Sequence, residues 1–188
     1  MELVSEAVTF AVKAHDGMRR KKSDSPYILH PMEAAVIVGT MTDDQHLIAA
    51  AALHDVVEDT DITIEEIEER FGKRVRELVQ SETENKRADL PPEATWRIRK
   101  EESLAELKNT DDLGVLMVWL GDKLANMRAI YRDFKVEGVA MWQRFNQKDV
   151  GQQAWYYHSI VTLTQRLSHT SAWLEYKTLT ELVFGKGV

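Results

Sequence analysis

The sequence of 188 residues contains no cysteine. It therefore cannot form a disulfide, a thiolate nucleophile, or a zinc or iron–sulfur site with cysteine ligands. Any metal ion must be held by histidine, aspartate or glutamate. With only 9 glycines and 4 prolines, the chain is neither collagen-like nor rich in flexible linkers. Its length is sufficient for one domain with an apolar core that needs no disulfide.

Long apolar runs are also absent. No stretch of about 18 apolar residues occurs, so we expect no transmembrane helix. Glu2 and Glu6 are acidic where a signal peptide has basic residues and then an apolar run. We therefore expect a soluble, cytoplasmic protein that makes no contact with a membrane.

Basic residues are in the minority, and the net charge of 31 acidic and 24 basic residues is −7. This balance is unfavourable for a protein that coats nucleic acid, so we expect no nucleic-acid partner. It does not exclude a small anionic ligand. One local basic run, Arg19 to Lys22, is typical of a solvated loop, but it could also contact such a ligand.

Apolar residues recur at helical spacing along most of the chain, with short breaks between segments. Thr63 and Glu66 match a capping box, and Pro31 suits the first turn of a helix. We expect an all-α fold of about nine helices in one domain spanning residues 1–188. The expected helices are at about 3–14, 31–39, 43–57, 63–72, 73–85, 93–107, 115–134, 149–167 and 171–184.

Four polar residues follow the apolar segment 49–53: His54, Asp55, Glu58 and Asp59. If the segment is a single helix, Glu58 lies one turn after His54 and Asp59 one turn after Asp55. Three carboxylates beside a histidine on a largely buried helix repel one another. The arrangement therefore requires a compensating cation.

Two more polar residues occur in apolar surroundings. His30 lies at the start of a predicted helix, and Asp122 follows the apolar run 115–120, with Asn126 one turn later. The candidate metal ligands are two imidazoles and two carboxylates: His30, His54, Asp55 and Asp122. Such a mixed nitrogen and oxygen set suits one Mn²⁺, Fe²⁺ or Zn²⁺ ion better than Mg²⁺. An ordinary core or surface role for each residue is the alternative, and the order of the set makes it less favoured.

The order His, His-Asp-x-x-Glu-Asp, Asp resembles that of the HD-domain metal-dependent phosphohydrolases. The flanking segments narrow the resemblance. Segments 26–31, 51–60, 71–72 and 122–128 are similar to the hydrolase domain of the RelA/SpoT family. The similarity covers roughly residues 5–130, so we expect no synthetase domain and place the chain in the small alarmone hydrolase branch.

The resemblance implies an HD-type helical bundle with one bound ion, usually Mn²⁺ in this family. The implied metal ligands are the four residues named above. Glu58 and Asp59 would position and activate the attacking water, and Asn126 would contact the nucleoside. Arg20 and Lys21 match the family's phosphate-binding pair.

The assignment of the phosphate-binding pair has an alternative. The spacer between His15 and Pro26 is about one residue longer than the usual form, so the pair could instead be Lys21 and Lys22. Beyond residue 130, Lys148 is a further candidate for substrate binding.

The reaction implied by the resemblance is metal-dependent hydrolysis of the 3′-pyrophosphate of guanosine alarmones, (p)ppGpp, to GDP or GTP and pyrophosphate. An HD phosphohydrolase that acts on another nucleotide, such as an adenosine alarmone analogue or the 2′-phosphate of NADPH, is the first alternative. A non-catalytic nucleotide-binding HD module is the second. The expected partner is a small-molecule nucleotide, and the sequence leaves open whether the chain forms a homo-oligomer.

Overall fold

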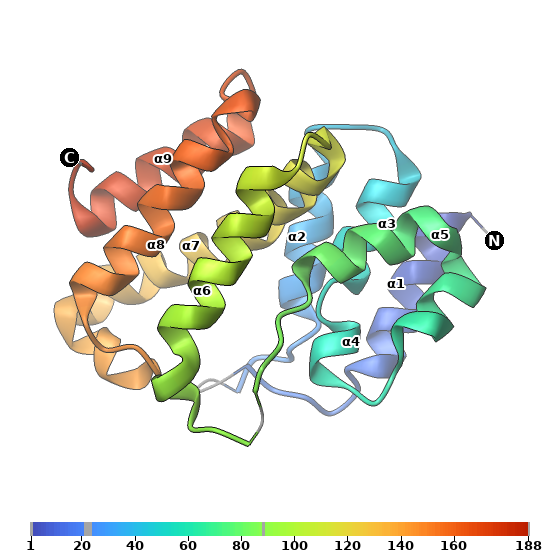
Figure 1. Cartoon of the computed structure of the whole chain (residues 1–188), viewed down its shortest axis with the longest axis horizontal. Helices are drawn as coiled ribbons and strands as arrows, with labels where there is room; N and C mark the ends of the chain where they lie inside the picture. The colour runs from blue at the N-terminus through green and yellow to red at the C-terminus, as the bar shows by residue number, and fades with distance from the viewer. Residues whose placement is uncertain (1, 21–23, 88, 188) are drawn as a thin grey trace. The chain divides into compact units, whose positions relative to one another are not determined.

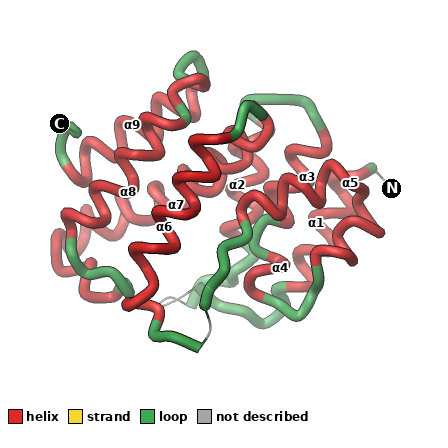
Figure 2. The backbone as a smooth tube through the Cα atoms, in the orientation of Figure 1, coloured by secondary structure: helices red, strands yellow, loops and turns green. Residues whose placement is uncertain are grey.

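The computed structural model describes residues 2–20, 24–87 and 89–187. Within these ranges the chain is helical and has no β-strand, as the backbone trace shows (Figure 2). The α-helices are α1 (Leu3–Ala14), α2 (Leu29–Gly39), α3 (Gln45–Leu53), α4 (Val56–Asp59), α5 (Ile64–Glu82), α6 (Pro92–Asn109), α7 (Leu113–Glu137), α8 (Val150–Leu163) and α9 (Ser171–Phe184). The prediction of an all-α fold with about nine helices is confirmed. None of these helices is long and apolar enough to span a membrane.

The chain, whose helices are labelled in Figure 1, divides by its internal contacts into two compact units. The first consists of Met1–Thr83 and Asp112–Ala125, and the second of Glu84–Asp111 and Asn126–Val188. Helix α7 contributes its first half to the first unit and its second half to the second. That residues 1–188 form a single domain stays a prediction.

The core of the first unit is built around α3. Its alanines, Ala49 to Ala52, are almost completely buried. Helices α1, α2 and α5 all pack against α3. Because alanine side chains are short, three neighbouring helices can approach this one closely. The polar residues that follow α3 are thereby held at the centre of the unit.

Helices α2 and α7 approach each other closely at Gly121. A Cβ atom on Gly121 would lie 2.6 Å from Cγ2 of Val38 and 3.0 Å from the carbonyl oxygen of Ala34. Only glycine leaves room for this approach, whatever its backbone angles. The contact brings Asp122 beside the first turn of α2, where His30 lies.

The helix expected over 43–57 is wrong at its C-terminal end, because α3 ends at Leu53 and the short α4 begins at Val56. His54 and Asp55 therefore lie in a turn between two helices. The His54 ring bonds the carbonyl of Ala51, which an uninterrupted helix would offer to the Asp55 amide. The side chain thus competes with the helical hydrogen bond at this point.

The capping box at the start of α5 is confirmed. The Glu66 amide donates to the Thr63 hydroxyl, and the Thr63 amide donates to the Glu66 carboxylate. The break expected near Gly72 is present as a kink inside α5, where Gly72 has a φ of 85°.

The second unit packs α8 against α6 and α9. An aromatic cluster fills its interior. The Phe184 ring stacks on Trp142 and on Tyr157, with ring centres 5.3 and 5.6 Å apart. These contacts account for several of the aromatic residues in the last third of the chain.

Candidate metal centre

The four candidate ligands come together inside the first unit. His30 lies in the first turn of α2, His54 and Asp55 lie in the turn between α3 and α4, and Asp122 lies in α7. His30, His54 and Asp122 are buried, with at most 4% of each residue exposed. Segments separated by up to 92 positions in the sequence thus contribute to one polar cluster in an apolar core.

The donor atoms form a closed ring of contacts. Nε2 of His30 lies 2.9 Å from Oδ1 of Asp122 and 3.5 Å from Oδ2 of Asp55. Nε2 of His54 lies 3.0 Å from Oδ2 of Asp55 and 3.4 Å from Oδ1 of Asp122. His30, His54 and Asp122 each offer one ligand atom within 4.8 Å of the others. Asp55 is not part of this set of three, but its Oδ2 contacts both imidazoles.

The His54 ring has the orientation that a metal ligand needs. Its Nδ1 lies 2.8 Å from the carbonyl oxygen of Ala51 and must donate there, because a carbonyl can only accept. Its buried Nε2 is close to two carboxylate oxygens, yet it makes no aligned hydrogen bond. In the neutral ring this Nε2 lone pair points into the cluster, as it does in histidine–metal sites.

The cluster has the dimensions of a coordination sphere. Neighbouring ligands around an ion with bond lengths of about 2.1 Å are about 3.0 to 3.4 Å apart. The four contacts of the ring lie close to this range. Two carboxylates supply two negative charges, which a divalent cation would neutralise. The residues therefore fit a divalent metal ion.

The titration properties of the ligands show how the protein compensates these charges by itself. Burial opposes the charged form of His54, but Asp55 and Asp122 outweigh it and hold the pKa of His54 well above its usual value. Burial likewise opposes ionisation of Asp122, but Lys123 and His54 hold the pKa of Asp122 well below its usual value. A protonated imidazole thus occupies the electrostatic role that a cation would otherwise take.

Asp122 is bonded by a lysine, which in turn contacts a buried glutamate. Nζ of Lys123 bonds Oδ2 of Asp122 and lies 3.5 Å from Oε2 of Glu82. The same ammonium lies 4.7 Å from the centre of the Trp119 ring, and the Trp119 indole donates to the carbonyl of Ser81. Burial raises the pKa of Glu82 to about 8, with Lys123 opposing and Asp122 adding to the shift. This buried acidic group therefore lacks sufficient positive charge around it.

Asp55 is hydrogen-bonded by a tyrosine. The Tyr27 hydroxyl donates to Oδ2 of Asp55 at 2.6 Å. The Tyr27 ring lies 5.0 Å from the ring of His15 and 6.1 Å from that of His30. Burial, Asp55 and Asp59 raise the pKa of Tyr27 far above its usual range, so the hydroxyl keeps its proton.

Glu58 and Asp59 lie on α4, shortly after the two candidate ligands in the turn, and both are half-buried. The Asp59 amide donates to the carbonyl of Asp55 at 2.9 Å, which fixes α4 to that turn. The negative charge of Asp59 adds to the rise in the pKa of Tyr27. Of the predicted water-activating pair, Asp59 thus acts electrostatically on Tyr27, which bonds Asp55.

The predicted substrate-binding residues are less closely tied to this cluster. Arg20 lies in the loop between α1 and α2, where its amide donates to the carbonyl of Ser25. Lys21 lies outside the described residues, as does its alternative partner Lys22. Asn126 and Lys148 belong to the second unit, so their predicted roles stay predictions.

Several residues of the cluster were missed by the sequence reasoning: His15, Tyr27, Glu82, Trp119 and Lys123. Tyr27 and Lys123 had a weak signal, since one lies three residues before His30 and the other next to Asp122. His15 and Glu82 had none. Burial lowers the pKa of His15, although Asp55 and Asp59 oppose this, and its Nε2 has no hydrogen-bond partner.

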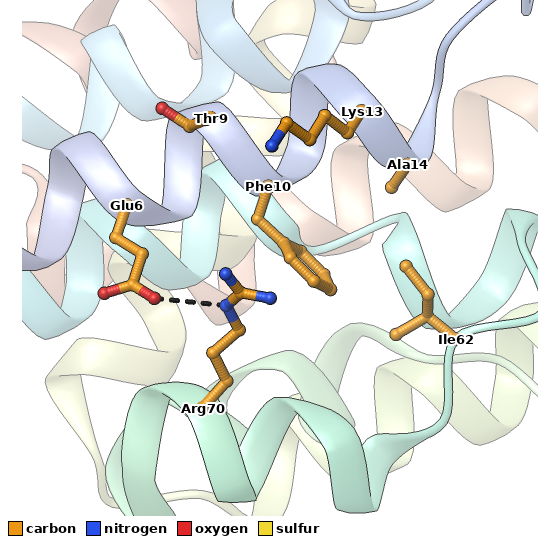
Figure 3. A pocket seen from close by; sticks show the side chains of 7 residues that line it. All are labelled: Glu6, Thr9, Phe10, Lys13, Ala14, Ile62 and Arg70. Carbon is orange, nitrogen blue, oxygen red and sulfur yellow. Dashed lines mark hydrogen bonds and ion pairs between the residues drawn. The ribbon is translucent and has the colours of Figure 1, made fainter.

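A separate pocket of about 510 Å³ lies between α1 and the start of α5 (Figure 3). Nε of Arg70 donates to Oε1 of Glu6 at 3.1 Å across it, and the guanidinium lies 4.8 Å from the centre of the Phe10 ring. The pocket is lined by Glu6, Thr9, Phe10, Lys13, Ala14, Ile62 and Arg70. None of the candidate ligands lines it, so it is distinct from the polar cluster.

Comparison with known families decides the classification of the fold. The model of the HD domain matches residues 7–149, which include every candidate ligand. The chain belongs to the HD-domain family. Family membership and the His/Asp cluster together indicate a divalent metal ion.

Curated relatives of this HD domain are much longer proteins. The chain is 36% identical over 141 residues to the guanosine-3′,5′-bis(diphosphate) 3′-pyrophosphohydrolase of Aquifex aeolicus, covering 74% of this chain and 20% of that protein. It is 39% identical over 137 residues to the putative chloroplastic GTP diphosphokinase RSH1 of Arabidopsis thaliana, covering 69% of this chain and 15% of that protein. The chain thus spans about a fifth or less of the length of these relatives.

Two solved structures match most or nearly all of the HD-domain chain. One, described as a metazoan ortholog of SpoT that hydrolyzes ppGpp, has a TM-score of 0.76 at 24% identity and covers 99% of this chain and 98% of that chain. Another, the 1.85 Å crystal structure of lmo0812 from Listeria monocytogenes EGD-e, has a TM-score of 0.72 at 28% identity. It covers 86% of this chain and 99% of that chain. Both matches support the all-α HD fold.

Proposed function

We propose that this HD domain is a Mn²⁺-dependent hydrolase that removes the 3′-pyrophosphate from guanosine alarmones, (p)ppGpp, leaving GDP or GTP. The proposed metal ligands are His30, His54, Asp55 and Asp122. The observation that carries the proposal is the closed ring of four donor atoms, in which the buried Nε2 of His54 has no aligned hydrogen-bond partner. Fe²⁺ and Zn²⁺ suit the same donors and are the alternatives to Mn²⁺.

When bound, the metal would lower the pKa of a water molecule and neutralise charge on the phosphoryl group. Asp59 and Glu58, which follow the ligand turn on α4, would hold the attacking water and accept its proton. Asp59 is the better placed of the two, because its charge acts on Tyr27, which donates to the proposed ligand Asp55.

The substrate would carry several negative charges, which require cations outside the ligand set. Arg20 lies in the only basic run that the sequence analysis singled out, and Lys21 and Lys148 are the further candidates. Asn126 would hydrogen-bond the nucleoside. The choice of a guanosine 3′-pyrophosphate rests on the names of the Aquifex aeolicus relative and of the metazoan structure.

The test is pyrophosphate release from guanosine 3′,5′-bis(diphosphate) by metal-stripped protein, with and without added Mn²⁺. We expect release only with the metal, and its loss in Asp55→Ala. Asp61→Ala is the matched control, because Asp61 is an exposed aspartate six positions later with no assigned role. It should keep the activity of the parent protein.

Two other results would change the proposal. Metal binding without pyrophosphate release would retain the metal centre and reject the substrate. A panel with an adenosine analogue and NADPH would then identify another phosphohydrolase or a nucleotide-binding module. The absence of both metal binding and turnover would overturn the proposal as a whole.

A further inference from the structure

Tyr27 is the residue through which the candidate metal centre is tied to the loop before α2. Its amide donates to the carbonyl of Met18 at 2.9 Å, and its carbonyl accepts from the amide of His30 at 2.9 Å. The backbone of Tyr27 is therefore held on both sides. Its ring lies against the rings of His15 and His30, so the hydroxyl has little freedom to move.

The Tyr27 hydroxyl bonds the carboxylate oxygen of Asp55 that faces the other candidate metal ligands. Oδ2 of Asp55 accepts the Tyr27 hydroxyl at 2.6 Å, and it is also the oxygen that lies 3.0 Å from Nε2 of His54 and 3.5 Å from Nε2 of His30. A carboxylate oxygen has two lone pairs, so one can remain on the hydroxyl while the other faces the ring of donors. The hydrogen bond thus sets the direction of the remaining lone pair.

The two carboxylate ligands are supported in different ways. Asp122 is bonded by the ammonium of Lys123, which carries a positive charge. Asp55 is bonded by a neutral hydroxyl, which orients the carboxylate without cancelling its charge. The Tyr27 hydroxyl therefore restricts the rotation of Asp55 without adding a positive charge beside it.

We propose that Tyr27 is a positioning residue of this site: its hydroxyl orients Oδ2 of Asp55 toward the metal position. This inference rests on the proposed function, because it assumes that Asp55 is a metal ligand. Partners of this kind, which bond a ligand rather than the metal, typically change metal affinity about 10- to 100-fold when they are removed. A tyrosine that serves only to fill space would have no such effect.

The test is the variant Tyr27→Phe, which keeps the ring and its contacts with His15 and His30 and removes only the hydroxyl. Titration of metal-stripped protein with Mn²⁺ by calorimetry should give a Kd at least about 10-fold weaker than that of the parent protein. At saturating Mn²⁺, kcat should fall because Asp55 is less well oriented, while KM for the nucleotide should change little. The melting temperature in EDTA reports separately on whether the variant folds.

Two further variants sharpen the test. Tyr131→Phe makes the same chemical change in α7 of the second unit and should leave the Mn²⁺ affinity unchanged. Incorporation of p-aminophenylalanine at position 27 restores an N–H donor on the same ring and should recover most of the affinity. Recovery by the donor would exclude a purely structural effect of the substitution.

The outcomes separate the two proposals. If the parent protein binds Mn²⁺ and Tyr27→Phe binds it equally well with the same kcat, the positioning role is wrong and the proposed function stands. If the parent protein binds no divalent metal, both are overturned. Weaker binding in Tyr27→Phe that the amino-substituted ring does not recover would also reject the role of the hydrogen bond.

Discussion

The imidazole of His54 donates from Nδ1 to the carbonyl of Ala51, three residues earlier in α3, at 2.8 Å. This bond ends the helix before Asp55 and leaves Nε2 of His54 as the atom that faces the other donors. One side-chain hydrogen bond therefore determines both the local backbone and the direction of a candidate metal ligand. The neighbouring Asp55 is presented from the turn that this bond creates.

Substitution of His54 should abolish metal binding. His54→Gln removes the candidate ligand atom Nε2 from a buried position. We expect the Mn²⁺ affinity to fall by more than the roughly 100-fold that is typical when a residue that bonds a ligand, rather than the metal, is removed. The measurement is a calorimetric Mn²⁺ titration. His46→Gln is the control, because His46 is an exposed histidine whose Nδ1 contacts Asp44. Equal affinities of the two variants would contradict the assignment of His54.

Metal binding should release protons. In the metal-free protein the pKa of His54 is held well above 6.5 by Asp55 and Asp122, so near pH 7 the ring is protonated. A metal ligand must be neutral imidazole, so metal binding displaces this proton. At pH values below the pKa of His54, log Kd should therefore fall by about one for each unit by which the pH rises. Calorimetry in buffers of different ionisation enthalpy counts the protons released. A Kd independent of pH between 6 and 8 would be inconsistent with this expectation.

Glu82 should make the metal-free protein less stable as the pH rises. Its pKa is about 8 in the folded chain and 4.5 as a model value, so the folded state binds the proton more tightly than the unfolded state. The contribution of Glu82 to the free energy of unfolding is therefore largest below pH 4.5. It declines as the pH rises and is lost once the pH passes 8. Glu82→Gln should remove a decline of up to about 4 kcal/mol between pH 5 and 8, since one pKa unit corresponds to about 1.36 kcal/mol.

The measurement for Glu82 is urea unfolding in EDTA at several pH values. The parent protein and Glu82→Gln should have similar free energies of unfolding near pH 5, and the variant should be the more stable at pH 8. Parallel pH curves for the two proteins would show that Glu82 ionises normally in the folded chain.

Gly121→Ala should destabilise the first unit. The added methyl group would lie 2.6 Å from Val38 and 3.0 Å from the carbonyl of Ala34, so α2 and α7 must separate. The expected cost is about 1 to 3 kcal/mol in the free energy of unfolding, with weaker metal binding because Asp122 follows Gly121. Gly39→Ala is the control: its nearest neighbour would be Ile48 at 3.8 Å, and it should be neutral or slightly stabilising. A neutral Gly121→Ala would show that the two helices adjust freely.

Local patterns in the sequence were sufficient for most of the helices. The apolar spacing of residues 115–134 predicted α7, and Thr63 with Glu66 predicted the start of α5. The helix over 43–57 was predicted too long, because apolar periodicity contains no information about a side chain that bonds its own backbone. His54 does this to Ala51, and only the folded geometry shows it.

The sequence by itself determined the class of fold and the chemical types of the candidate ligands. Helical periodicity is a local property, and without cysteine only histidine and carboxylate side chains could supply the donors. The tertiary structure decided which partners support those ligands. Tyr27 meets Asp55 and Glu82 meets Lys123 across 28 and 41 positions in the chain. Such contacts depend on how α2, α5 and α7 pack around α3, and the cost of burying unpaired polar groups then selects the hydrogen bonds that form.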